Sequence, residues 1–344
     1  MKHLKQLTLL IALTLPFFTI AQNFDHAVDY LDFLGKEQEV VTKNMWKYTK
    51  ALAHSKSDRS INAKRENLIK SVERTISKIE KADGFDGDDY KNQVLKHLRL
   101  NEKLLKHEYA EIIDMKAVAE QSYDMMEAYI LAQRLANKKM AESQAEYETN
   151  LYAFAAKHNI EIQESESDLG KKMEISNQVF KHYNDMYLVF FKVFINEIYL
   201  WDAVENNDVN GIQQNANALA SSAKEGIEIL KTAEGYKNDK ALILATKTTF
   251  NYLIDEAENQ IPVIVDFLIL EDNMNNIKET LEKTPERKRT KKQIDAYNDK
   301  VKEINKAAKE YNKVNASLNT ERQNVLGKLD SAKEKFLERH IPKD

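Results

Sequence analysis

The sequence has no cysteine, and proline and glycine are scarce, with 4 and 8 residues among 344. The absence of cysteine excludes disulfides, thiolate metal sites, thiol nucleophiles and lipid attachment at a lipobox cysteine. Few glycines and prolines leave few positions for tight turns. Nucleotide-binding glycine loops, the dinucleotide fingerprint and the Gly-x-Ser-x-Gly elbow are also missing. The chain therefore predicts long helices and lacks the usual catalytic turns.

Hydrophobic residues make up 42% of the chain and charged residues 31%, which is enough apolar surface for two ordinary domains. Their spacing follows the helical repeat almost throughout. We therefore predict an all-α fold of two tandem antiparallel helix bundles with a long C-terminal helix. The N-terminal bundle covers residues 22–160, the acidic, unpatterned residues 161–170 form a linker, and the C-terminal bundle covers residues 171–344.

The first 21 residues predict a signal peptide. Lys2 and Lys5 precede an apolar run, and the small residues Thr19 and Ala21 stand before a cleavage site that we place before Gln22. The formal net charge is −4, and loss of the two lysines with the leader makes it −6. We expect a protein exported to the periplasm, the cell surface or the medium, not a lipoprotein, and without affinity for nucleic acid.

Residues 183–201 are the most apolar stretch after the leader, so we expect them to form a buried helix at the centre of the second bundle. A membrane-active protein is the alternative, because residues 186–201 and 252–270 are rich in aliphatic and aromatic side chains. Lys192, Glu197 and Asp266 interrupt these runs, and neither run has 18 clean apolar residues. Packing in the core is the preferred interpretation, and membrane contact is not favoured.

Three short patterns recur in the same order and predict an internal duplication. They are residues 71–85 with 222–236, residues 30–33 with 183–186, and Phe154 and His158 with Phe336 and His340. The first pair shares the ending alanine, acid, glycine, aromatic, and Gly84 is expected to take the left-handed position that ends its helix.

In the second half, Pro262 is expected to kink a helix that spans residues 239–270. Thr284, Pro285 and Glu286 form a helix-start pattern, which predicts a last helix of some 50 residues ending near His340. At ~1.5 Å per residue such a helix is about 75 Å long. The basic run of residues 287–292 lies at this start and is interpreted as a solvated patch.

No catalytic, cofactor-binding or metal-ligating residue is predicted. No histidine has a glutamate three residues before it, as di-iron bundles require. His107 and Glu111 share a helix face but fit an exposed pair better than a metal site. The acids at positions 83, 86, 88 and 89 lack the acidic twelfth residue of a calcium loop, so helix capping is the preferred explanation.

The C-terminal pattern Leu329-Asp330-x-Ala332-x3-Phe336-x3-His340-Ile341-Pro342, together with the leader ending in Ala21-Gln22, resembles uncharacterised secreted helical surface proteins of Bacteroidota and spirochaetes. This resemblance implies an exported helical protein and supplies no catalytic residues. The function expected is a non-enzymatic binding or scaffold protein of the bacterial envelope, whose partner is an envelope protein or surface ligand.

Overall fold

The computed structural model describes residues 23–162 and 167–343, and in this part of the chain the fold is all-α, as predicted. The only extended pairing among the described residues is an isolated bridge between Tyr236 and Asp239. The predicted leader, residues 1–21, and the centre of the predicted linker, residues 163–166, lie outside the described residues.

The first half of the chain folds as α1 (Ala27–His54), α2 (Asp58–Lys81), α3 (Asp89–Lys103), α4 (Tyr109–Ala119) and α5 (Tyr123–Lys157). A five-residue π-helical segment, η1 (Leu104–Glu108), joins α3 to α4. Side chains at helical spacing form its core, among them Leu34, Leu68, Val72, Val94 and Leu98.

The second half contains α6 (Asp168–Glu205), α7 (Val209–Thr232), α8 (Ala241–Asp255), α9 (Ile261–Lys283) and α10 (Lys291–His340). A second π-helical segment, η2 (Glu256–Gln260), joins α8 to α9, and a short 3-10 turn, η3 (Glu286–Lys288), precedes α10. The apolar stretch 183–201 lies in α6, where Met186, Phe190, Val193 and Leu200 are buried in the core of this half.

The two halves match in the lengths of their elements. Helices α2 and α7 each have 24 residues, and α3 and α8 each have 15. Each 15-residue helix runs into a five-residue π-helical segment, which begins at Leu104 in the first half and at Glu256, 152 residues later, in the second. Such segments are rare in helices, so their recurrence at the same place is informative.

An aromatic cluster also recurs with matching geometry. The Phe85 and His158 rings lie 5.1 Å apart at 78°, and the Tyr236 and His340 rings lie 5.0 Å apart at 76°. Phe154 and Phe336 occupy the same place in the two clusters, each at the edge of the loop aromatic, with interplanar angles of 75° and 80°.

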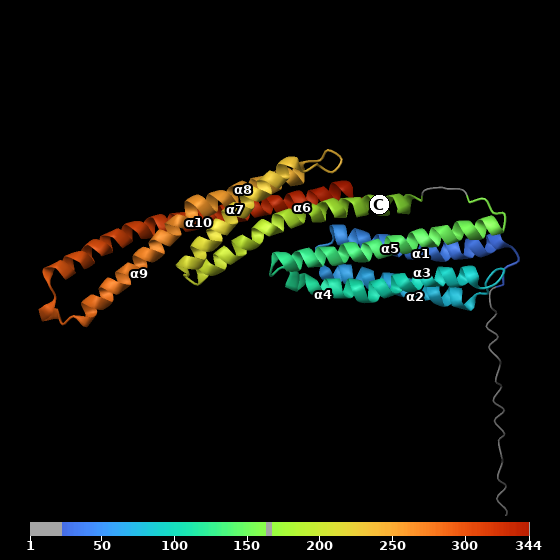
Figure 1. Cartoon of the computed structure of the whole chain (residues 1–344), viewed down its shortest axis with the longest axis horizontal. Coiled ribbons are helices and arrows are strands. Elements are labelled where there is room, and N and C mark those ends of the chain that lie inside the picture. Colours follow the sequence, from blue (N-terminus) through green and yellow to red (C-terminus); the bar gives the residue numbers. More distant parts are fainter. Residues whose placement is uncertain (1–22, 163–166, 344) are drawn as a thin grey trace, which may run out of the picture.

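The hairpin of α9 and α10 is longer than its counterpart in the first half. Phe154 and Phe336 are 182 residues apart, whereas the π-helical segments are 152 residues apart, so the second half contains 30 additional residues in this hairpin. Figure 1 shows the consequence: α9 and α10 extend together beyond the other helices at one end of the molecule. We call the hairpin from residue 266 to residue 317 the arm.

The two halves pack against each other along α6 (Figure 1). Trp46 of α1 is buried in the core of the second half. Near the tip of the α4–α5 hairpin, Met126 and Ile130 pack against Phe191 and Ile195 of α6. The apolar surface is therefore continuous from one half into the other.

Three local expectations were wrong. The long helix starts at Thr290, which caps Lys291 and forms a capping box with Gln293, whereas Thr284 ends α9. The left-handed residues after α2 are Asp86 and Gly87 (φ 55° and 98°), not Gly84. Pro262 is not in mid-helix: it opens α9 directly after the π-helical segment, where its missing N–H is tolerated.

Candidate functional site

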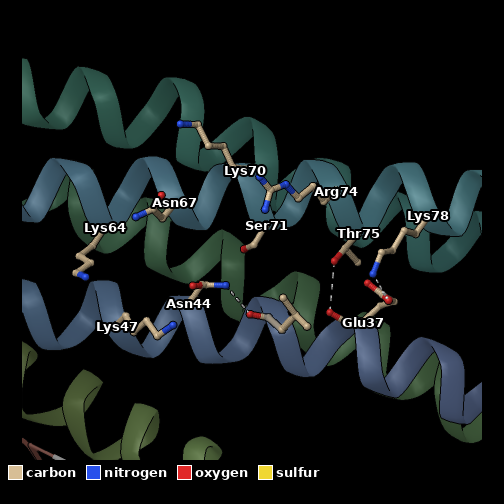
Figure 2. A pocket seen from close by; sticks show the side chains of 11 residues that line it. Glu37, Asn44, Lys47, Lys64, Asn67, Lys70, Ser71, Arg74, Thr75 and Lys78 are labelled. Carbon is tan, nitrogen blue, oxygen red and sulfur yellow. Dashed lines mark hydrogen bonds and ion pairs between the residues drawn. The ribbon is translucent and has the colours of Figure 1, made fainter.

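A groove of about 380 Å³ runs between α1 and α2 on the surface of the first half (Figure 2). Its floor carries the hydroxyl side chains of Ser71 and Thr75, which are buried. Because these two side chains are small, they leave a hollow where larger residues would have filled the seam between the helices. The remaining lining residues are Glu37, Val40, Asn44, Lys47, Lys64, Asn67, Lys70, Arg74 and Lys78.

The lining of this groove is strongly basic. Five of its side chains are cationic and one, Glu37, is acidic, although the whole chain has a net charge of −4. Lys78 is paired with Glu37 at 2.7 Å. The other four cations, Lys47, Lys64, Lys70 and Arg74, form no ion pair with any carboxylate in the described part of the chain. The groove thus combines unpaired positive charge with hydroxyl and amide groups.

A second polar group lies inside the second half. Glu197 on α6 and Glu256 in η2 are both fully buried, and each has one carboxylate oxygen without a hydrogen-bond partner. Glu197 is ion-paired with Arg322 of α10, whose guanidinium lies 5.8 Å from the Trp201 ring. Trp201 in turn donates a 2.8 Å hydrogen bond to Glu256.

Burial changes the protonation of these acids. Loss of solvation and the negative charge of Glu197 raise the pKa of Glu256 from 4.5 to about 8. Burial also raises the pKa of Glu197, while the Arg322 guanidinium opposes that change. The arrangement that fits these directions is a protonated Glu256 beside a Glu197–Arg322 ion pair near neutral pH. Both acids are enclosed by the bundle, so a dissolved molecule reaches them only if the helices separate.

The residues weighed for metal binding remain apart. His107 and Glu111 are exposed, and among the described residues no group of three or more histidines, aspartates and glutamates could hold a metal ion. The acidic loop does not work as predicted. Asp88 stands at the start of α3, but its side chain makes no capping hydrogen bond. Asp86 instead pairs with Lys157 at 2.7 Å.

The basic run of residues 287–292 forms the turn at the tip of the arm. Arg289 donates hydrogen bonds to the carbonyl groups of Leu281 and Thr284, and so holds the end of α9. The other basic residues of this run are exposed. Arg289 is therefore partly structural, whereas the sequence predicted only a solvated patch.

Both apolar segments place their larger side chains in the core. Met186, Phe190, Leu200, Leu253 and Ile261 are buried there. None of the helices in the described ranges combines the length and the apolar character that a membrane crossing requires.

Sequence reasoning missed both polar clusters. For the groove, the signal was the recurrence of Lys64, Arg74 and Lys78 at helical spacing on one helix. For the buried acids, the signal was Glu197, a single acid on an otherwise apolar face. Comparison with family models, curated proteins and solved structures found no match for this chain.

Proposed function

We propose that this chain is an exported, non-enzymatic binding or scaffold protein of the bacterial envelope, and that its arm contacts a protein partner. The signal-peptide pattern supports export, and the resemblance to secreted helical surface proteins supports the same placement. The arm is the observation that carries the binding role.

The arm is a two-helix structure without a core of its own. No residue between Val265 and Leu318 is buried, although α9 and α10 face each other along the whole hairpin. The seam holds half-buried apolar side chains, such as Phe267 stacked on Tyr311 with ring centroids 4.4 Å apart. Two helices shield only part of each other's apolar stripe, and a partner helix or groove would cover the rest.

We also propose that the two halves arose by internal duplication and that the arm is a later extension of one copy. The equal lengths of α3 and α8, the recurring π-helical segments and the matching aromatic clusters support this origin. An insertion confined to one hairpin changes the surface without disturbing the core, which is how new binding surfaces are usually added.

Site-specific photo-crosslinking in the envelope of the producing cell tests the binding role. A photoreactive residue at Ile294 in the arm is compared with one at Ile229 on α7, because the two positions are 43% and 47% exposed. The proposal predicts a discrete crosslinked partner from position 294 and not from position 229. Equal crosslinking at both positions, or none from the arm, contradicts it.

Shortening the arm supplies the second measurement. Deletion of residues 268–281 and 295–308 removes about four turns from each helix and keeps the turn and its capping box. We expect this variant to fold, because it loses no buried residue, and to lose the partner. Turnover of a substrate by the purified chain, abolished by a single substitution, would refute the non-enzymatic assignment.

A further inference from the structure

The two halves have the same seam between their first two helices, and the comparison isolates what is special about the groove. Buried residues align Val41 of α1 with Val193 of α6, and Val72 of α2 with Ala223 of α7. In this alignment Asn44 corresponds to Asn196 and Ser71 to Ser222, so two polar residues are shared. Val40 and Arg74 correspond to Lys192 and Glu225.

In the second half these residues bridge the seam. Asn196 donates a 3.1 Å hydrogen bond to Ser222, and Lys192 lies 3.6 Å from Glu225. Positive charge on one helix is thus balanced by negative charge on the other, and the seam is crossed by its own side chains.

In the first half the same seam is open. Asn44 donates only to the Val40 carbonyl of its own helix, at 2.9 Å, and Ser71 donates to the Leu68 carbonyl of its own helix, at 2.7 Å. Arg74 faces Val40 where the second half has an ion pair. Figure 2 shows no bond across the seam at this level, and Lys64 reaches from α2 toward α1. The unbalanced charge is a local property of this groove and not a general feature of the repeat.

We propose that the α1–α2 groove binds an anionic oligosaccharide, with carboxylate, sulfate or phosphate groups on Lys47, Lys64, Lys70 and Arg74. The cations on α2 extend from residue 64 to residue 78, a length of about 21 Å, which suits several linked charged units better than a single ion. The Asn44 and Asn67 amides and the two floor hydroxyls supply donors and acceptors for sugar hydroxyl groups.

Other anionic partners fit this groove less well. Its lining has no aromatic residue on which nucleic-acid bases could stack. Val40 is the only apolar side chain in the lining, so there is little to anchor the groove in a lipid layer. The arm of a second copy is a poor occupant because its tip, residues 287–292, is itself basic.

Calorimetric titration of the full chain tests this proposal. The probes are a heparin-derived hexasaccharide and a uronate hexamer, with neutral maltohexaose and inorganic phosphate as reference compounds. We expect both anionic hexasaccharides to bind, with affinity that falls as salt is raised from 50 to 300 mM, and the reference compounds to bind at least tenfold more weakly.

Two variants copy residues from the second half. Arg74→Glu and Lys64→Asn install the residues found at Glu225 and Asn215, and both positions are exposed, so the fold should tolerate them. Each should weaken the anionic probes at least fivefold. The matched control is Lys138→Glu, which makes the same charge change as Arg74→Glu on α5, a helix that does not contact α1 or α2.

Equal losses in Arg74→Glu and Lys138→Glu would show only general charge attraction and would overturn the proposal. Tighter binding of a poly-glutamate peptide than of either hexasaccharide would overturn the choice of an oligosaccharide. These outcomes are independent of the arm, so failure here leaves the crosslinking test of the arm unaffected.

Discussion

The indole of Trp201 on α6 donates a 2.8 Å hydrogen bond to the Glu256 carboxyl group in the π-helical segment η2. This contact ties the irregular part of the α8–α9 junction to the central helix of the second half. It also gives a fully buried acid one defined partner while its other oxygen stays unpaired.

Glu256→Gln should remove a pH dependence of stability. The pKa of Glu256 is raised from 4.5 to about 8, so the folded state holds this proton more tightly than the unfolded chain. The stability that the group contributes is therefore complete below about pH 4.5 and is lost as pH rises through about 8. Urea unfolding from pH 5 to pH 9 should show the wild type losing on the order of 2–3 kcal/mol relative to the glutamine variant.

The neighbouring Glu258 provides the control for this measurement. It lies in the same π-helical segment but is exposed and pairs with Lys224 at 2.5 Å. Glu258→Gln should leave the pH profile of the wild type unchanged. If the profiles of wild type and Glu256→Gln are parallel, Glu256 is ionised in the folded protein and the assignment is wrong.

Arg322→Met should destabilise the second half by about 2–4 kcal/mol, because it leaves the buried Glu197 without its counterion. The first half shows an apolar solution, since Met45 and Met140 stand at the corresponding positions. Adding Glu197→Met to Arg322→Met should therefore recover most of the loss. Urea midpoints of the single and double variants decide the matter, and a double variant no more stable than the single one rules this interpretation out.

The arm should open more readily than the rest of the chain. Because no residue between Val265 and Leu318 is buried, local unfolding of the arm exposes little of the core. Hydrogen exchange followed by mass spectrometry should show faster exchange at residues 270–310 than in α6 and α7. Phe267→Ala, which removes the stacking on Tyr311, should speed exchange in the arm and leave α6 unchanged. Equal protection in the arm and in α6 would contradict this expectation.

Two glycines should respond to alanine in opposite directions. A methyl group at Gly226 would lie 2.5 Å from the Phe250 ring, so Gly226→Ala should destabilise the protein by about 1–3 kcal/mol. Gly327 lies within α10 with nothing within 4 Å of such a methyl group, so Gly327→Ala should stabilise by about 0.5–1 kcal/mol. Thermal melts of the two variants should shift in opposite directions, and a shared direction would contradict the packing described at Gly226.

Helical periodicity carried most of the fold prediction. The 3.6-residue repeat located the helices because each buries one face, as in α2 with Leu68, Val72 and Ile79. Helix ends were predicted less well. The Thr284-Pro285-Glu286 pattern satisfies the local rules for a helix start, yet the chain turns there and starts α10 at Thr290, where a capping box with Gln293 is available.

Neither polar cluster could be recognised from local sequence. Lys64 and Arg74 on α2 look like ordinary exposed cations, and only the packing of α1 beside them leaves them without acidic neighbours. Glu197 and Arg322 are 125 residues apart, and no short-range pattern connects them. The sequence signal at Glu197 was an anomaly without a partner.

The sequence by itself determined the all-α class, the long helices and the pattern of repeated motifs. These depend on composition and on the spacing of apolar residues along one helix, which are local properties. Only the tertiary structure decided which helices lie side by side, and therefore which charges are balanced across a seam, which acids are enclosed and which hairpin extends beyond the core. Those outcomes depend on contacts between residues far apart in the chain, because burial and electrostatic pairing are set by spatial neighbours.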